Sequence, residues 1–289
     1  MLKKLLCFTL LAISLQSQAA GERLLIWETS TAGSQVYLLG SMHLARADIY
    51  PLRREIMQAF EGADKLVVEL DISGAGQLAI QQRMLERGAY PAGRSIRDDL
   101  SPATWQALSQ QLQASGLPPF LMESMKPGLV ITTLSTFEMM KLGLDPEQGI
   151  DRYFLRLARG QKPILELETV DEQLNVLLDF PQPDLLVRQT LGQLDQLESI
   201  MAQLLDSWKR GDAAALNKLV IEDELAEHPE YRELQRRMFD DRNRAMTDKI
   251  LALQQAGGRY FVVVGAGHLV GNRGIIALLQ QQGQRPRQL

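Results

Sequence analysis

The sequence predicts an α/β fold in which a mainly parallel sheet carries large helical insertions. Strand-like apolar runs occur in only three regions of the chain, and long segments of helical character separate them. The first region also reads strand, helix, strand within roughly 35 residues, which is the length and order of a parallel βαβ unit. Few strands and many helices are typical of this class.

The first region begins with two short strand-like runs, at 23–27 and 35–39, which are joined by a polar turn containing Gly33. This pattern predicts a β-hairpin. A helical stretch follows at about 51–60, and a buried type of strand follows at 65–70. The second strand of the hairpin, the helix and this last strand form the predicted βαβ unit.

The second and third regions are single strands set between helical segments. Helical patterns fill about 75–160 and 170–255, and the strand 162–168 lies between them. The chain then ends with a strand at 259–265 and a helix at 274–282. We therefore expect a sheet core with two helical insertions.

Residues 1–19 have the features of an export signal. Lys3 and Lys4 precede an apolar stretch at 5–15 that is too short to span a bilayer comfortably, and small residues follow it. We predict a signal peptide over 1–19, a single domain over 20–289, and a periplasmic or otherwise exported protein. The alternative is an uncleaved N-terminal segment that anchors the protein in the inner membrane.

Composition excludes several classes of function. The formal net charge of −4 becomes −6 when Lys3 and Lys4 leave with the signal, and no basic run is present, so nucleic acid is not an expected partner. Cys7 is the only cysteine and lies in the signal, which excludes disulfides and thiolate metal ligands in the exported chain. We expect a peptide or small-molecule substrate, and membrane contact only through an uncleaved N-terminus.

Two of the three histidines occupy the same local setting. His43 and His268 each stand three residues after a glycine that ends an apolar run. With 22 glycines among 289 residues, chance seldom produces this spacing twice. We call these segments the first and second histidine boxes; they are Leu38-Leu39-Gly40-Ser41-Met42-His43 and Val263-Val264-Gly265-Ala266-Gly267-His268.

Paired acids, Glu69 with Asp71 and Glu166 with Glu168, end two further strands. Because functional groups gather at the carboxyl ends of parallel strands, we expect these acids to lie near both histidines. Two neutral imidazoles and a carboxylate form a ligand set for a divalent metal, and a second carboxylate can act as a general base. The similarity of the two acid pairs, and of the two boxes, also suggests a duplicated half.

Structural roles are the alternative for each of these residues. A histidine after a strand is more often a hydrogen-bonded structural group, and acids at strand ends often cap helices or form ion pairs. The second box also resembles a dinucleotide-binding loop, Gly265-x-Gly267-x-x-x-Gly271, with one residue too many. No Asp or Glu follows Gly271 to bind a ribose, so we reject a dinucleotide site.

Several segments, taken together and in order, resemble the TraB/GumN family, whose animal relatives include the Tiki metalloproteases. The resemblance covers essentially the whole chain after the signal. Its segments are 37–44, Val67-Val68-Glu69-Leu70-Asp71, Gly149-Ile150-Asp151, Leu165-Glu166-Leu167-Glu168-Thr169, Arg242-Asn243-Arg244-Ala245-Met246 and 264–271.

The resemblance implies a fold related to the erythromycin esterase and haem-binding ChaN proteins. It also implies a metal-dependent hydrolase site built from both boxes and a glutamate. His43 and His268 would be metal ligands, and Glu69 a ligand or the base. Arg242 and Asn243 would reach the site to bind an oxyanion or a substrate carboxylate; the alternative for Arg242 is a surface charge.

The leading hypothesis is an exported metal-dependent hydrolase, a peptidase, with Mn²⁺, Co²⁺ or Zn²⁺ bound by His43, His268 and Glu69. Glu69 or Glu166 would assist the attack of water on a peptide carbonyl, and Arg242 would stabilise the developing charge. One alternative is a non-catalytic periplasmic protein that binds a peptide or haem. Another is a metal-independent esterase in which one histidine is the general base.

Overall fold

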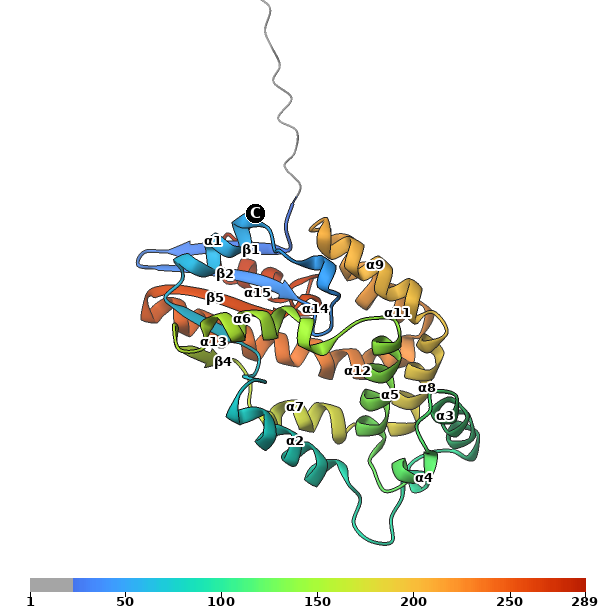
Figure 1. Ribbon diagram of the computed structural model, residues 1–289. Helices are drawn as coiled ribbons and strands as arrows, with labels where there is room; N and C mark the ends of the chain where they lie inside the picture. Colours follow the sequence, from blue (N-terminus) through green and yellow to red (C-terminus); the bar gives the residue numbers. More distant parts are fainter. Residues whose placement is uncertain (1–22) are drawn as a thin grey trace, which may run out of the picture.

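A six-stranded sheet holds the two histidine boxes on neighbouring strands. The computed structural model describes residues 23–289, and Figure 1 shows the sheet with the helices around it. The strands are β1 (Ile26–Thr31), β2 (Ser34–Ser41), β3 (Lys65–Val68), β4 (Ile164–Glu166), β5 (Gly258–Gly265) and β6 (Arg287–Gln288). Their order across the sheet is β4–β3–β5–β2–β1–β6.

The four strands from β4 to β2 are parallel, and two antiparallel strands extend the sheet beyond β2. The predicted hairpin is confirmed as β1 and β2, which pair from Ile26 with Leu39 to Thr31 with Ser34. Because β5 lies between β2 and β3, the predicted βαβ unit encloses a strand from the far end of the chain. The predicted class, α/β with a mainly parallel sheet and many helices, is confirmed.

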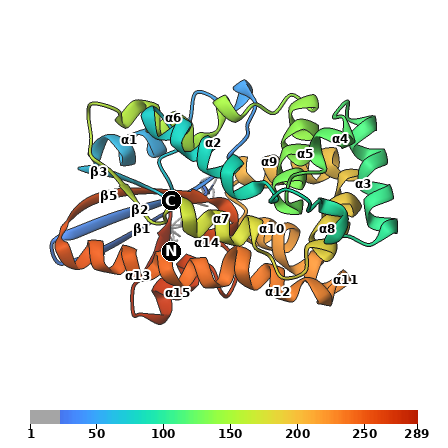
Figure 2. The ribbon, with the colours of Figure 1, turned by 90° about the horizontal axis from the view of Figure 1, so that it is seen from below.

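Helices cover both faces of the sheet, as Figure 2 shows from below. One face carries α1 (Arg54–Gly62) and α6 (Ile150–Ala158), and the other carries α13 (Asp241–Ala256) and α15 (Ile275–Gln281). On the first face the rings of Phe60, Phe154 and Phe261 contact one another, with centroids 4.8 to 5.5 Å apart. This aromatic contact ties α1 and α6 to β5 at the centre of the core.

Two helical segments pack beside the sheet around an apolar core of their own. The first contains α2 (Ala75–Gly88), α3 (Pro102–Ala114), α4 (Pro119–Met122) and α5 (Pro127–Lys141), and the second contains α7 (Val170–Leu178), α8 (Pro183–Leu194), α9 (Leu197–Lys209), α10 (Ala213–Asn217), α11 (Asp223–Glu227) and α12 (Arg232–Gln235). Ile96, Leu108 and Val130 of the first segment are fully buried in one cluster with Val187 of the second. The two segments therefore fold together, because each covers the apolar face of the other.

The two ends of the described chain lie together at the β1 edge of the sheet. Trp27 pairs with Gln288, and the Leu24 N–H donates to the Leu289 carbonyl at 2.7 Å. The export signal predicted over 1–19 precedes this edge and lies outside the described residues. Among residues 23–289, no helix has both the length and the apolar composition that crossing a membrane requires.

Candidate active site at the strand ends

Three neighbouring parallel strands end at the same edge of the sheet and carry predicted site residues there. β2 and β5 pair in register as far as Ser41 and Gly265, and β3 ends just before Glu69. The side chains of His43, Glu69 and His268, which come after these strand ends, converge beside Gly265. The point where a Cβ of this glycine would stand is 3.3 Å from Glu69 Oε1, 3.5 Å from His43 Nε2 and 3.5 Å from His268 Cδ2. The structure thus brings both histidines and one predicted acid together.

His43 is held by a carboxylate that the sequence analysis did not assign to the site. Its Nδ1 atom lies 3.0 Å from Asp151 Oδ2, and the hydroxyl of Ser41 donates to Asp151 Oδ1 at 2.7 Å. The carboxylate of Asp151 raises the pKa of His43 from 6.5 to about 9. The ring is 57% exposed, whereas Asp151 is buried. The His43 ring is therefore accessible to solvent, and the buried carboxylate of Asp151 fixes its orientation.

Asp151 reaches His43 because the start of α6 is fastened to the loop after β2. The Ile150 N–H donates to the Met42 carbonyl at 3.0 Å. Gly149 packs so closely that a Cβ there would stand 2.3 Å from the carbonyl oxygen of His43. Only glycine, which has no Cβ, allows so close a contact. This explains why a glycine precedes Ile150 and Asp151 in the segment Gly149-Ile150-Asp151.

His268 is buried and held by an amide instead of a carboxylate. Nδ1 lies 2.6 Å from Asn243 Oδ1, and the orientation of this amide is set because its Nδ2 donates to the Arg273 carbonyl at 2.9 Å. Nδ1 therefore carries the hydrogen, and Nε2 faces Glu69 Oε1 at 3.8 Å. Burial lowers the pKa of His268 from 6.5 to about 4, against the opposing charge of Glu69, so the metal-free ring is neutral at pH 7.

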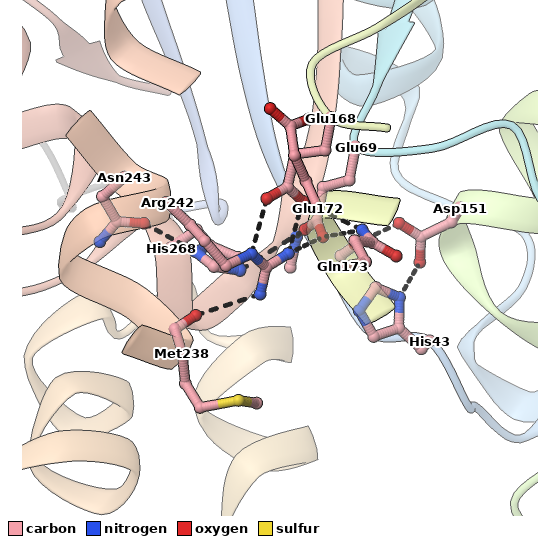
Figure 3. A network of polar contacts seen from close by, with 12 residues as sticks. His43, Glu69, Asp151, Glu168, Glu172, Gln173, Met238, Arg242, Asn243 and His268 are labelled. Carbon is pink, nitrogen blue, oxygen red and sulfur yellow. Dashed lines mark hydrogen bonds and ion pairs between the residues drawn. The ribbon is translucent and has the colours of Figure 1, made fainter. Parts of the chain in front are cut away.

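Glu69 and Glu168 share one arginine between the two histidines. Arg242 donates from Nη2 to Glu69 Oε2 at 2.8 Å and from Nε and Nη2 to the two oxygens of Glu168 at 2.7 and 2.6 Å. Gln173 donates to Glu168 at 3.0 Å. Figure 3 shows these acids in the middle of the cluster, with Asn243 on one side and Asp151 on the other. The arginine compensates two buried negative charges at once.

The charge of Glu69 is maintained in spite of its burial. Burial by itself would raise its pKa. The charge of His268, which is present only below about pH 4, and the charges of His43 and Arg242 oppose this effect. The Gly265 N–H also donates to Oε1 at 2.6 Å. Together these groups lower the pKa of Glu69 to about 2. An ionised carboxylate therefore stands between the two rings across the physiological pH range.

A cavity of about 360 Å³ opens onto this cluster. Its polar side is formed by ionisable and amide groups, and its other walls are mostly apolar. The lining residues are His43, Glu69, Asp151, Gln173 and Arg242 on the polar side, with Leu70, Ile72, Thr132, Val176, Leu177 and Met238 around them. This combination, a small convergent polar group in an apolar hollow, is typical of a ligand or active site.

The donor set fits a divalent metal. Both Nδ1 atoms are occupied by Asp151 and Asn243, which leaves both Nε2 atoms to bind a metal, as in metal-ligating histidines generally. His43 is protonated at neutral pH without a metal and would release its Nε2 proton on binding one. Two donor atoms bound to the same tetrahedral metal ion lie about 3.4 Å apart. The distance of 3.8 Å between His268 Nε2 and Glu69 Oε1 is close to that separation. The contacts are looser than those of a formed site: within residues 23–289, no group of three or more His, Cys, Asp or Glu side chains has metal-binding geometry.

The structure does not bring Glu166 into the cluster. β3 and β4 pair in parallel with Val68 opposite Glu166. The Glu166 side chain is exposed and accepts the Asp71 N–H at 2.7 Å. Glu168, two residues later, occupies the buried position beside Arg242. Residues two apart share a face of a regular strand, so the pairing register does not separate these two acids. β4 ends at Glu166, and the bend of the chain after it brings Glu168 to Arg242.

Three contributors were not assigned to the site by the sequence analysis: Ser41, Asp151 and Gln173. A weak signal existed for two of them, because Ser41 lies inside the first histidine box and Asp151 inside a segment of the family resemblance. Gln173 lies on α7 in a Gln- and Leu-rich helical region and carries no distinguishing pattern.

The fold and this cluster together define an α/β protein with two histidines and a buried carboxylate at the strand ends. Residues 25–288 match the model of the TraB/PrgY/gumN family, and the chain therefore belongs to that family. The family resemblance found in the sequence is thus confirmed.

Relatives within this family differ in how much their names say about function. The chain is 28% identical to the uncharacterized protein YbaP of Escherichia coli over 246 residues, which cover 84% of this chain and 87% of YbaP. It is 22% identical to the metalloprotease TIKI1 of Danio rerio over 300 residues, which cover 86% of this chain and 59% of TIKI1. No solved structure matches the chain.

Proposed function

We propose that this protein is an exported metal-dependent hydrolase that cleaves peptides. The observation that carries the proposal is the convergence of His43 Nε2, the His268 ring and Glu69 Oε1 beside Gly265, with His43 and Glu69 lining a cavity. The similarity to a protein named as a metalloprotease, TIKI1, supports the reaction class. The sequence of residues 1–19 supports export.

In this proposal His43, His268 and Glu69 hold the metal, which is Mn²⁺, Co²⁺ or Zn²⁺. A divalent ion in such a site acts as a Lewis acid and lowers the pKa of a water molecule. The role of ligand suits Glu69 better than the role of base, because a group with a pKa of about 2 takes up a proton poorly at neutral pH.

The other residues of the cluster prepare these ligands. Asp151 and Asn243 fix the two rings and leave each Nε2 directed toward the cluster. Arg242 is bound to Glu69 and Glu168, so its main role is to hold two acids in place, and its position beside the cavity keeps positive charge near a developing oxyanion. The apolar walls exclude water from the reacting bond.

The test is metal content combined with hydrolysis of a peptide library. The full chain is loaded separately with Mn²⁺, Co²⁺ and Zn²⁺ and then exposed to a chelator. We expect about one ion per chain, cleavage in its presence, and loss of cleavage on chelation. A protein that binds peptides or haem but cleaves nothing under any of the three metals contradicts the proposal and favours a binding protein.

A metal-independent esterase is the second candidate, and the His43–Asp151 pair is the observation that favours it. The same pair weakens it, because a pKa of about 9 leaves His43 protonated at neutral pH, and a protonated ring is no base. Ester hydrolysis that is unaffected by chelators and rises toward pH 9 would favour this candidate over the metallohydrolase.

A further inference from the structure

A second hollow, of about 460 Å³, lies between α2 and α5 beside the catalytic cavity. We call it the α2–α5 groove. Its walls are mainly apolar and come from both helices, and its one charged lining residue is Arg152. The apolar contributors are Ile80 and Met84 of α2 and Leu129, Phe137 and Met140 of α5.

The groove adjoins the candidate active site. Ile72 and Thr132 line both the groove and the cavity that contains His43 and Glu69. These two residues lie at the boundary between the hollows, so a chain lying in the groove ends beside the histidine cluster. This adjacency distinguishes the groove from an isolated surface hollow.

Large apolar side chains are left exposed along the two helices that form the groove. Within residues 23–289 six such side chains stand out, and four of them belong to α2 and α5: Leu78, Leu85, Phe137 and Met140. Phe137 and Met140 line the groove and are 38% and 50% exposed. Leu85 is one helical turn from Gln81, which also lines the groove, and so lies on its rim. Apolar area of this kind, gathered beside a site, marks a surface that a ligand covers.

The dimensions and polar groups of the groove fit an extended polypeptide. From Leu129 to Met140, α5 borders it over about 16 Å, which is the length of about five residues of extended chain. Thr132 and Thr133 donate their hydroxyl hydrogens to the helix carbonyls of Gly128 and Leu129, at 2.8 Å each. Their oxygen lone pairs remain as acceptors for peptide N–H groups.

We propose that the α2–α5 groove binds the polypeptide substrate on one side of the cleaved bond and selects large apolar side chains such as leucine, methionine and phenylalanine. This inference rests on the proposed peptidase function. Among the described residues that line the groove none is acidic, so a basic side chain finds no partner there, and the one cation, Arg152, is paired with Glu147 outside the lining.

Binding is tested apart from cleavage, so that the two proposals fail separately. The His43→Ala chain in a chelator is titrated into fluorescein-labelled peptides of about ten residues, whose central residues are leucine and phenylalanine, serine, or lysine, and anisotropy gives each Kd. We expect the apolar peptide to bind about tenfold more tightly than the serine peptide, and the lysine peptide to bind most weakly.

Matched variants locate the binding surface. Phe137→Ser and Met140→Ser should each weaken binding of the apolar peptide by about tenfold and leave the serine peptide unchanged. Phe120→Ser is the control, because this phenylalanine of α4 is 71% exposed and lies outside the groove. Thermal unfolding confirms that each variant is folded.

Equal binding of the apolar and serine peptides overturns the groove proposal, as does a Phe137→Ser protein with unchanged affinity. Binding of dodecanoate in competition with the peptide, with no preference among peptides, overturns it in favour of an acyl chain. Selective peptide binding without cleavage by the metal-loaded wild-type protein supports the groove and contradicts the hydrolase.

Discussion

The two histidine boxes share one pattern, an apolar pair followed by Gly-x-x-His, and the structure gives their histidines opposite environments. His43 follows β2 into an extended loop and is 57% exposed, whereas His268 follows β5 into the short helix α14 (Ala266–Leu269) and is 6% exposed. Asp151 raises the pKa of the first to about 9, and burial lowers the pKa of the second to about 4. The strands determine where the rings lie, and the helices that approach them determine which ring carries a proton.

Glu69 and Arg242 connect the two boxes, and breaking their ion pair should produce the largest effect on stability. Arg242→Met leaves Glu69 and Glu168 buried together without a cation, which should lower the free energy of unfolding by about 3–5 kcal/mol. Urea denaturation measures this change. Arg244→Met is the matched control: its exposed ion pair with Asp241 should contribute no more than about 1 kcal/mol. Equal effects of the two substitutions would mean that the cluster is not electrostatically coupled.

The two histidines should affect the pH dependence of stability in opposite directions. His268 takes up a proton below pH 6.5 in the unfolded chain, but only below about pH 4 in the folded protein. The free energy of unfolding therefore decreases as pH falls through this window, by up to about 3 kcal/mol. His43 binds its proton more tightly when folded, so its contribution is present below pH 6.5 and is lost as pH rises through about 9. That contribution is small because the ring is exposed.

Urea unfolding in a chelator from pH 4.5 to 9.5 tests both directions by comparison with His268→Gln and His43→Gln. The contribution of Glu69 to stability is constant over this pH range, because it is present above about pH 4.5 and is lost only as pH falls toward 2. The same pH slope in wild type and His268→Gln between pH 6.5 and 4.5 would show that this ring is not the buried neutral group described above.

Exchanging the partners of the two rings tests the comparison directly. Asp151→Asn should lower the pKa of His43 from about 9 toward 6.5, and Asn243→Asp should raise the pKa of His268. Asp151→Asn should also weaken metal binding by about 10–100-fold, as loss of such a supporting group does elsewhere. NMR of the ring protons against pH follows each titration, with His228, which contacts Glu230, as an internal reference. Unchanged pKa values in both variants would assign the difference to burial alone.

The smallest effect is expected at the acid that faces away from the cluster. Glu166→Gln should change kcat/KM by less than about threefold, because its carboxylate contacts only the Asp71 N–H among the hydrogen bonds described. Glu168→Gln weakens the bond to Arg242 and should lower kcat/KM by at least about tenfold. The reverse order would restore Glu166 as the general base suggested by its sequence.

Much of this fold follows from local pattern, because each long strand and the helices between them carry their own periodicity. The two-residue β6 has no such pattern and was not predicted; it forms because the chain end pairs with β1. His43, His268 and Glu69 could be found from sequence, since each lies within three residues of the end of a strand. Glu166 and Glu168 could not be ranked, because residues two apart share a face of a strand and only the bend after the end of β4 separates them. Asp151 is 108 residues from His43, and only the fastening of α6 to the first box brings them together.

The central claim is that the two boxes form one metal site. The most direct test is titration of Co²⁺ into the wild type, His43→Ala, His268→Ala and His228→Ala proteins by calorimetry and visible absorption. The account predicts about one ion per chain in the wild type and His228→Ala, and loss of that ion and its absorption band in both of the other variants. Full Co²⁺ affinity in either His43→Ala or His268→Ala would contradict a shared site.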